Sequence, residues 1–525
     1  MLNKKNYKKN NKIKKVLIAN RSEIVSRIIY TCRALEISPV VIYTQQDALL
    51  SYINLADDAY KLPGEGFSAY ISQDEIIKIA HKSGADAIHP GYGFLAESNI
   101  FAQKVTDSGL IWVGPDPDCI NLMGNKIQAK NIMAQAGVPT VPWHNISCDS
   151  PQVDTLALNC AQELSFPVVI KDPLSGGGKA MRIAYSPKEF EAALSTVLSE
   201  SKRLTGAKNI LIEKYIKLGR HIEIQIAGDG ENYIHLFERE CSIQRRNQKV
   251  IEESPCCFIS QKTKETLYRA ALLAAKSVNY KNIGTVEFIV TPEEKFYFLE
   301  VNTRLQVEHS VTEMTTGIDL VALQFQIAQD KKLLYTQEDI KHNGHAIECR
   351  IYSEDPERNF LPTTGAITNI ALPTGPFTRT DCAVYNGYTV TPHFDPMLAK
   401  VTVYGYTRDH AIKYLKGLLE RSSISGVITN INLLCQLLET TEFTLGKIHT
   451  KLLSDQNFIK KILSKPSQET SQEILPDLSC AQEIKEEILA GCALILLEEL
   501  TQEKIIKRQE SSWRTSHLDN FYKNY

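Results

Sequence analysis

The chain has 525 residues, of which 43% are apolar and 23% are charged, and this length and balance indicate a globular protein of three or four domains. The formal net charge of −2 excludes a broad basic surface for nucleic acid or for an anionic membrane. No apolar stretch reaches the roughly 18 residues that a membrane-spanning helix needs.

The N-terminus and the cysteines indicate the compartment. Residues 1–14 are basic but lack the apolar core of a secretory signal, so we expect a disordered tail. The twelve cysteines form no C-x-x-C pair, and Cys256 and Cys257 are adjacent. This arrangement suits neither a zinc knuckle nor a simple disulfide framework. We therefore expect reduced thiols and a cytoplasmic protein.

Residues 15–124 alternate between strand and helix patterns. A buried strand is predicted at 16–20, an amphipathic helix at 21–35 and a second strand at 39–44. This βαβ order predicts a Rossmann-like layer, although the G-x-G-x-x-G fingerprint of a dinucleotide site is missing. The string HPGYGFLAES at 89–98 predicts a tight loop at a strand end, and alone it is compatible with a purely structural role.

A glycine-rich string lies within residues 125–345, in a segment, 143–214, that has the pattern of an inserted subdomain. LSGGGKAM at 174–181 follows a strand predicted at 167–172. Consecutive glycines can present backbone N–H groups to a phosphate, and Lys179 adds positive charge. Because the Walker A spacing is absent, a flexible surface turn is the alternative interpretation.

Two carboxylates, Glu287 and Glu300, lie inside apolar strand patterns at 284–290 and 295–302 that are joined by a short hairpin-like link. A buried ionised carboxylate is costly unless it is paired or bound to a metal. The strand period places Asn302 on the same face as Glu300. Two carboxylates and an amide oxygen suit Mg²⁺, with phosphate oxygens completing the shell. The alternative is a pair of structural salt bridges.

The loop that follows, residues 302–309, is dense in ionic and amide groups. Arg304 can hold a planar oxyanion through two N–H donors, and Glu308 is placed to act as a general base. The strings QRRNQK at 244–249 and ECR at 348–350 supply further cations. A charged loop is usually a solvated surface, but this one directly follows the predicted metal strand, which favours a site.

The C-terminal part contains short strand patterns in 346–463, with a helix from Arg408. The polar segment 464–477, which contains two prolines, predicts a linker within a tail at 464–525. The Ser-x-x-Gln spacing that begins at Ser479 predicts a capped helix able to dock on this protein or on a partner. Its apolar stripe consists of Ile484, Ile488, Cys492 and Ile495.

Taken in order, these motifs resemble the biotin carboxylases of the ATP-grasp superfamily, from about Lys15 to about Leu463. The strings that carry the resemblance are IANRSEI, HPGYGFLAES, MGNKIQAK, EKYI followed by GRHIEIQ, ERECSIQRRNQKVIEE, GTVEFI, FLEVNTRLQVEHSVTEM, GHAIECRIYSEDP and FDPMLAK. The resemblance implies an α/β protein with a Rossmann-like N-terminal domain (15–124), an ATP-grasp domain (125–345) with a lid subdomain (about 143–214), and an α+β C-terminal domain (346–463).

The resemblance also implies an activity. The protein would be a ligase that uses ATP and bicarbonate to carboxylate biotin on a carrier protein, through carboxyphosphate. This is the first half-reaction of an acyl-CoA carboxylase, such as the acetyl-CoA carboxylase of fatty acid biosynthesis. The implied cofactors are ATP and Mg²⁺ or Mn²⁺, and biotin is expected as a carrier-bound substrate because no Met-Lys-Met occurs. The implied partners are a biotin carboxyl carrier protein, carboxyltransferase subunits and a second copy in a homodimer, with no nucleic acid or membrane.

Site roles follow residue by residue from the resemblance. The implied nucleotide residues are Lys126, Lys171, Gly177, Gly178, Glu213, Lys214, Tyr215, Ile216, His221, Gln244, Asn247, Glu287 and Glu300. The implied metal ligands are Glu287, Glu300 and Asn302. The implied bicarbonate residues are Lys249, Arg304, Gln306, Val307 and Arg350. Glu308 would deprotonate bicarbonate, and Arg350 would stabilise the enolate form of biotin.

Several positions depart from the family pattern. Leu174, Ser175 and Ala180 stand where glycine is usual, Asn247 replaces a histidine, Ser22 replaces a glycine, Ser98 an asparagine and Ser310 a proline. The implied metal ligands, base and bicarbonate cations remain, so the departures concern nucleotide affinity and the lid. They keep open a rival interpretation, in which the chain is a catalytically weakened or inactive scaffold subunit of a carboxylase complex.

Overall fold

The computed structural model describes residues 12–175, 180–372 and 374–464. The helix predicted from Ser479, residues 1–11 of the expected N-terminal tail, and Gly177 and Gly178 lie outside the described residues. In the part of the chain that the structure describes, no helix is long and apolar enough to cross a membrane.

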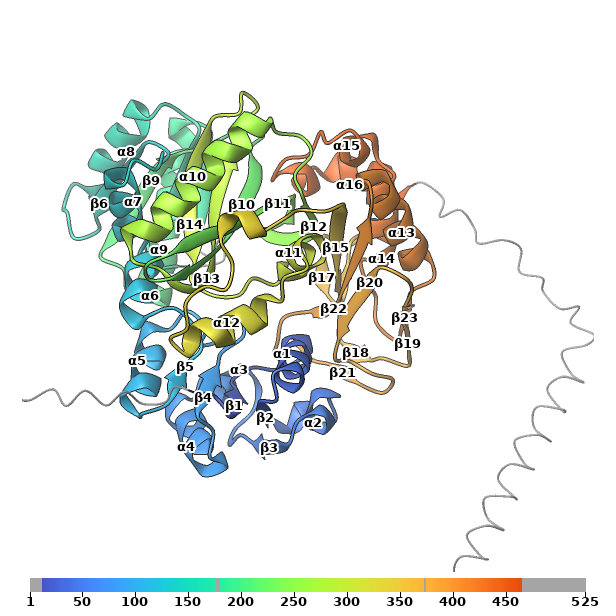
Figure 1. The fold of residues 1–525 in the computed structure, drawn as a ribbon. Coiled ribbons are helices and arrows are strands. Elements are labelled where there is room, and N and C mark those ends of the chain that lie inside the picture. Colours follow the sequence, from blue (N-terminus) through green and yellow to red (C-terminus); the bar gives the residue numbers. More distant parts are fainter. Residues whose placement is uncertain (1–11, 176–179, 373, 465–525) are drawn as a thin grey trace, which may run out of the picture. The chain divides into compact units, whose positions relative to one another are not determined.

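The N-terminal region is built on a five-stranded parallel sheet, drawn in blue in Figure 1. Its strand order is β3-β2-β1-β4-β5, which confirms the predicted Rossmann-like layer. The strands are β1 (Lys15–Ile18), β2 (Ser38–Tyr43), β3 (Asp58–Lys61), β4 (Ala87–His89) and β5 (Ile111–Trp112). The connecting helices are α1 (Glu23–Ala34), η1 (Gln45–Asp47), α2 (Tyr52–Leu55), α3 (Gly66–Tyr70), α4 (Gln73–Ser83), α5 (Asn99–Asp107) and α6 (Pro117–Gly124).

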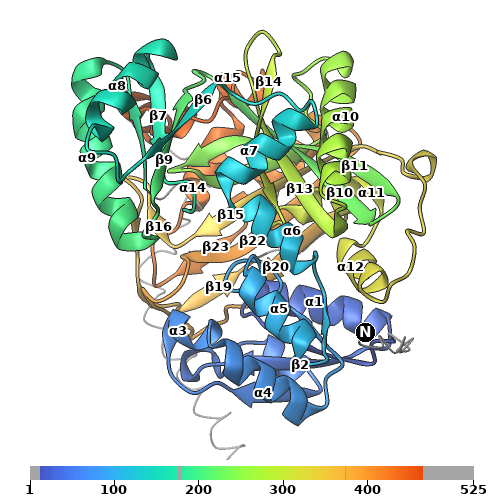
Figure 2. The same cartoon turned by 90° about the vertical axis from the view of Figure 1, so that its left-hand side faces the viewer.

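Residues 143–214 form a separate four-stranded antiparallel sheet in the order β6-β9-β7-β8, which stands with α8 and α9 at the upper left of Figure 2. The elements are β6 (Trp143–Ser147), α8 (Val153–Glu163), β7 (Val168–Lys171), β8 (Met181–Ala184), α9 (Pro187–Leu204) and β9 (Asn209–Lys214). Their apolar side chains, among them Ile170, Leu194 and Ile212, share a small core of their own. Helix α7 (Lys126–Gln135) precedes this sheet.

An eight-stranded antiparallel sheet forms the centre of the described chain, in the order β14-β13-β10-β11-β12-β15-β22-β20. Its strands are β10 (Arg220–Asp229), β11 (Tyr233–Arg245), β12 (Gln248–Ser254), β13 (Lys281–Val290), β14 (Phe296–Asn302), β15 (His345–Tyr352), β20 (Thr378–Cys382) and β22 (Met397–Gly405). Because β12 pairs with β15, with Ile251 opposite Cys349, strands from both sides of position 345 share one continuous sheet.

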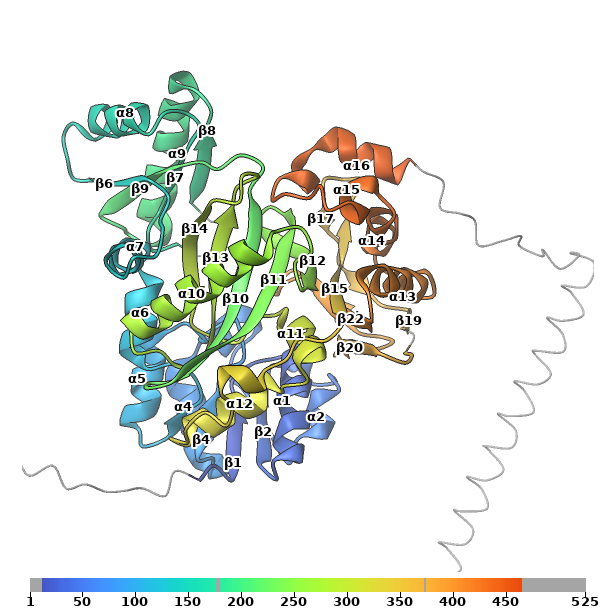
Figure 3. The ribbon, with the colours of Figure 1, turned by 45° about the horizontal axis from the view of Figure 1, so that its top comes forward.

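Helices cover this sheet, as Figure 3 shows: α10 (Gln261–Ser277) packs on β10 and β11, and α13 (Arg408–Glu420) packs on β22 and β15. The other helices are α11 (His309–Thr316), α12 (Leu320–Ala328), η2 (Gln337–Asp339), α14 (Ile431–Leu438), α15 (Thr441–Thr444), η3 (Leu452–Ser454) and α16 (Gln456–Leu463). The short strands pair as β16 (Glu354–Asp355) with β17 (Leu361–Pro362), β18 (Gly365–Ala366) with β21 (Thr389–Val390), and β19 (Asn369–Ala371) with β23 (Ser423–Ser425).

Candidate active site

A cavity of about 670 Å³ lies over the central sheet, and most of the predicted site residues line it. They come from strands of the central sheet, from the first residue of α7 and from loops such as that between β14 and α11, so that distant parts of the sequence meet. The predicted residues on its wall are Lys126, His221, Asn247, Lys249, Glu287, Glu300, Asn302, Arg304, Gln306, Val307 and Arg350. The HPGYGFLAES string also reaches the wall, through Tyr92 and Glu97.

Lys249 is the hub of the charged groups beneath the cavity. Its Nζ lies 2.5 Å from Glu223 Oε2, 2.9 Å from Glu287 Oε1 and 2.5 Å from Glu308 Oε1. Burial by itself would lower the pKa of Lys249, but these carboxylates outweigh it and hold the pKa well above its usual value. Lys249 therefore stays protonated, and its ammonium group can donate hydrogen bonds to an anion in the cavity.

Glu308, the predicted base, is fully buried immediately before α11. Its Oε1 is paired with Lys249, and its Oε2 accepts a hydrogen bond from Arg350 Nη2 at 2.9 Å. Burial opposes ionisation, yet Lys249, Arg350 and Arg239 hold the pKa of Glu308 well below its usual value. The carboxylate is therefore ionised and can accept a proton, and its basicity depends on how closely the two cations hold it.

Arg350 and Arg304 reach the cavity from two different elements. On β15, Arg350 Nη2 lies 2.5 Å from Glu252 Oε1 as well as beside Glu308. In the loop after β14, Arg304 Nη2 donates to Asn302 Oδ1 at 3.1 Å. The Arg304 guanidinium also forms an ion pair with Glu97 at 3.0 Å. The two guanidinium groups are thus anchored on one side, as preorganised oxyanion donors should be.

The predicted metal ligands lie on the neighbouring strands β13 and β14. Glu287 is the cross-strand partner of Glu300, and its Oε1 accepts a hydrogen bond from Asn302 Nδ2 at 2.8 Å. The Glu300 side chain is 36% exposed and lies 3.7 Å from Lys126 Nζ. Two carboxylates and an amide at a cavity wall form a donor set that fits a hard, oxygen-seeking cation such as Mg²⁺.

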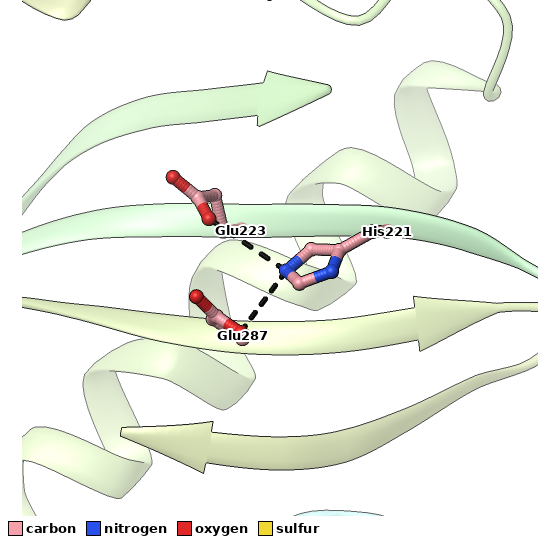
Figure 4. Close-up of side chains that lie close together, drawn as sticks. All are labelled: His221, Glu223 and Glu287. Carbon is pink, nitrogen blue, oxygen red and sulfur yellow. Dashed lines mark ion pairs between the residues drawn. The ribbon is translucent and has the colours of Figure 1, made fainter. Parts of the chain in front are cut away.

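A second convergence includes two residues of β10. Figure 4 shows His221 of β10 joined by ion pairs to Glu223 of the same strand and to Glu287 of β13. His221 Nε2 lies 3.1 Å from Glu287 Oε2 and 3.7 Å from Glu223 Oε2. Burial by itself would lower the pKa of His221, but Glu287 outweighs it and raises the pKa. Burial opposes ionisation of Glu287, but Lys249 and His221 outweigh it and lower its pKa. The imidazolium is therefore a further cation beside the predicted metal strand.

A smaller pocket of about 230 Å³ adjoins the cavity and shares part of its wall. It is lined by the predicted nucleotide residues Lys126, Lys171, Glu213, Lys214, Tyr215, Ile216, His221, Gln244, Asn247, Glu287 and Glu300. Apolar side chains such as Ile183 and Leu299 form the rest of the wall. A pocket with an apolar slot, several lysines and acidic groups has the features that a nucleotide requires.

Glu213, on the wall of this pocket, forms ion pairs with two lysines. Its carboxylate lies 3.0 Å from Lys130 Nζ and 2.6 Å from Lys171 Nζ. Burial opposes ionisation, but the two lysines outweigh it and lower the pKa of Glu213 to about 2. Burial also lowers the pKa of Lys130. On the other wall, Gln244 Nε2 lies 2.8 Å from His221 Nδ1, which fixes the imidazole.

The sequence reasoning missed four buried residues: Glu223, Glu252, Arg239 and Lys130. Glu223 could have been found, because it interrupts the apolar run of β10 as Glu287 interrupts that of β13. Arg239 donates to Glu223 Oε1 at 2.6 Å and so holds the carboxylate that faces Lys249. Nothing in the local pattern of Glu252 or Lys130 separates them from surface residues.

The family departures have structural consequences. Ser22 has φ 66° and ψ −149° and makes no capping hydrogen bond, and Ala180 has φ 45°, so both occupy conformations that favour glycine. Asn247 has φ 64°, which asparagine tolerates better than most residues. Ser310 donates a hydrogen bond to buried Glu348, a contact that proline could not make.

Three family models match consecutive parts of the chain. Residues 12–120 match "Biotin carboxylase, N-terminal domain", residues 125–336 match "Carbamoyl-phosphate synthase L chain, ATP binding domain", and residues 348–455 match "Biotin carboxylase C-terminal domain". With the pocket and charged cavity described above, these matches define an enzyme of the ATP-grasp ligase class.

Individual relatives place the chain in one family within this class. Biotin carboxylase 1 of Bacillus subtilis is 43% identical over 444 residues, which cover 84% of this chain and 98% of that protein. The mitochondrial methylcrotonoyl-CoA carboxylase subunit alpha of Rattus norvegicus is also 43% identical, but the match spans only 62% of its length. A similar solved structure is the biotin carboxylase domain dimer of Hydrogenobacter thermophilus 2-oxoglutarate carboxylase, in complex with MgADP, ADP and bicarbonate. Its TM-score is 0.82 at 40% sequence identity, and the match covers 85% of this chain and 98% of that one. The chain belongs to the biotin carboxylase family.

Proposed function

We propose that this protein carboxylates biotin with bicarbonate at the expense of ATP. The observation that carries the proposal is the placement of Glu308 between Lys249 and Arg350, under a cavity that also presents Arg304. The adjoining pocket, with Lys126 and its neighbours, is suited to a nucleotide. A base, several cations and a nucleotide pocket in contact are what phosphoryl transfer to bicarbonate requires.

The charged residues of the cavity would bind and deprotonate bicarbonate. Lys249, Arg304, Gln306, Val307 and Arg350 would bind bicarbonate, and Glu308 would take its proton. Bicarbonate then attacks the γ-phosphate of ATP, giving carboxyphosphate and ADP. An anion that draws Lys249 and Arg350 away from Glu308 removes the cations that lower its pKa, and so raises its basicity when substrate is present.

The nucleotide and metal roles rest on the smaller pocket. We propose that Lys126 and Lys171 contact the phosphates, with Gly177 and Gly178 covering them. The segment from Glu213 to Ile216 would bind the adenine, and His221, Gln244 and Asn247 would line the remaining wall. Glu287, Glu300 and Asn302 would hold Mg²⁺ or Mn²⁺, which when bound neutralises phosphate charge.

Biotin would enter as a substrate attached to a carrier protein, and Arg350 would stabilise its enolate form. Carboxybiotin would then pass to a carboxyltransferase, whose acceptor decides whether the complex is an acetyl-CoA carboxylase of fatty acid biosynthesis or another carboxylase. We also propose a homodimer, as in the solved relative described as a dimer, and a cytoplasmic location.

We propose domain boundaries at 15–124, 125–345 and 346–463. The three family-model matches, at 12–120, 125–336 and 348–455, support these limits. The lid subdomain would correspond to the separate sheet that begins at Trp143 and ends at Lys214.

The test is bicarbonate-dependent ATP hydrolysis in the presence of free biotin, with formation of carboxybiotin measured from labelled bicarbonate. We expect turnover that requires Mg²⁺ or Mn²⁺, bicarbonate and biotin together. A protein that binds ATP but yields no carboxybiotin would instead be the rival scaffold subunit, an outcome that Asn247 at the pocket would then explain.

A further inference from the structure

We infer that Cys257 is an activated thiol that exchanges with low-molecular-weight disulfides, at a site separate from the proposed active site. Cys257 is exposed, and its Sγ lies 3.6 Å from His345 Nδ1. On the opposite side of the same ring, His345 Nε2 lies 2.8 Å from Glu253 Oε2. A thiol, an imidazole and a carboxylate that orients the imidazole are thus aligned across residues that are distant in the sequence.

The orienting groups are buried and fixed. Glu253 and His345 are each 2% exposed, and Arg408 donates to Glu253 Oε2 at 2.6 Å and to Oε1 at 3.1 Å. Burial opposes ionisation of Glu253, but His345 and Arg408 outweigh it and lower the pKa of the carboxyl to about 2. The carboxylate therefore stays ionised and holds His345 Nε2–H, which leaves Nδ1 directed at the thiol.

His345 is suited to stabilise a thiolate as a neighbouring imidazolium. Burial by itself would lower the pKa of His345, but the hydrogen bonds to Cys257 and Glu253 outweigh it and raise the pKa to about 9. A neighbouring imidazole, His342, has its pKa lowered to about 4 chiefly by burial, and its Nε2 lies 3.5 Å from Ser254 Oγ. His345 is therefore protonated at neutral pH, and its imidazolium is the cation that the geometry places beside the Cys257 sulfur.

The neighbouring thiol provides a built-in contrast. Cys256 is fully buried, and its Sγ donates to Glu240 Oε2 at 2.9 Å. Burial raises its pKa well above the usual value, and Glu240 adds to the rise. A buried, protonated thiol is inert, so two adjacent cysteines are expected to differ strongly in reactivity.

The exchange step balances without any further reactant. The thiol proton of Cys257 passes to solvent, and the thiolate, held beside the His345 imidazolium, attacks one sulfur of the disulfide reagent. A new S–S bond forms at Cys257 while the bond between the two reagent sulfurs breaks, and the leaving sulfur departs as a thiolate that takes up the proton. Cys257 is oxidised to a mixed disulfide, and half of the reagent is reduced to a free thiol.

The test treats the full-length protein with oxidised glutathione at neutral pH and locates the adduct by peptide mass spectrometry. We expect Cys257 to be modified first, at least about tenfold faster than N-acetylcysteine, with Cys256 unmodified. His345→Gln should slow the modification of Cys257 about tenfold, and the matched variant His342→Gln should leave it unchanged.

Two outcomes would overturn the inference: an unchanged rate at Cys257 in His345→Gln, or equal modification of Cys256 and Cys257 in the native protein. If His345→Gln unfolds, Cys256 becomes labelled as well. In that case the inference is tested with Glu253→Gln, which keeps a hydrogen-bonding group at the same position, and with the rate of Cys257 relative to N-acetylcysteine. A Cys257 that reacts no faster than the free thiol would then show simple exposure.

Discussion

Glu252 and Glu253 are neighbours on β12, yet they head two different charge clusters on opposite faces of the sheet. Glu252 faces Arg350 at the candidate active site, where burial, with help from Glu348 and Glu308, raises its pKa to about 8. Glu253 is held by both His345 and Arg408, and its pKa is lowered to about 2 despite burial.

The difference lies in how well charge is paired. On the active-site face, Glu308 shares Arg350 with Glu252 and shares Lys249 with Glu223 and Glu287, so Glu252 has no cation to itself. On the Glu253 face, one carboxylate has two cations. Incompletely paired buried charge is expected where a substrate completes the pairing, whereas fully paired charge is expected to serve stability or a local chemical task.

The largest effect is expected at the base. Glu308→Gln should lower biotin carboxylation by about 10²–10⁴-fold, the range for losing a general base, as measured by carboxybiotin formation. Glu253→Gln is the matched control on the opposite face and should keep turnover within a few-fold. Similar losses in both variants would show that the two faces do not differ in function.

Arg350→Ala should reduce biotin carboxylation nearly as strongly, because Arg350 is assigned to biotin as well as to bicarbonate. It should spare part of the bicarbonate-dependent ATP cleavage, because Arg350 is not among the residues assigned to the nucleotide. Parallel assays of ADP release and carboxybiotin formation separate these effects. Near-normal carboxybiotin formation would remove Arg350 from the site.

Arg408→Ala is the counterpart on the other face. Its guanidinium pairs with Glu253 and lies over the rings of Phe258 and Phe443, so its loss leaves a buried carboxylate with one cation fewer. We expect about 3 kcal/mol lower unfolding free energy in urea titrations, with turnover of the folded protein within a few-fold of the parent. A stable but inactive variant would contradict the division between the faces.

The Glu253 face should also give stability a pH dependence. The pKa of His345 is raised to about 9, above its ordinary value, so its contribution is complete below that ordinary value and is lost as pH rises through about 9. Between pH 7.5 and 9.5 the unfolding free energy should fall by about 2 kcal/mol more than in His345→Gln. Equal slopes for the two proteins would show that His345 is not protonated at neutral pH.

The smallest effect is expected at the rim of the cavity. Ser22 occupies a glycine-type conformation without a compensating side-chain hydrogen bond, so Ser22→Gly should stabilise the protein by about 1 kcal/mol. Ser26→Gly, inside α1, is the control and should destabilise it by a similar amount because glycine weakens a helix interior. Thermal melting of both variants measures the sign, and a destabilised Ser22→Gly would show that the strain is compensated.

Much of the architecture could be predicted from the sequence because it depends on local pattern. The apolar runs at 16–20 and 39–44 became β1 and β2, and the carboxylates inside apolar strands correctly marked β13 and β14. Glu287, Glu300 and Asn302 could be grouped in advance because a short link joins the two strands and the strand period places Asn302 on the same face as Glu300. The motif resemblance supplied the roles, which the local pattern alone left open.

What the tertiary structure decided is which distant residues meet. Lys249 and Arg350 lie together because β12 pairs with β15, a register between segments that no local periodicity specifies. The same pairing brings Cys257 within reach of His345, 88 residues away, on the other face. Sequence by itself determined the strands and the chemical types of side chain, because these follow from hydrophobic period and composition. Only the packed sheet determined which carboxylates share a cation, because burial and distance set pKa and pairing together.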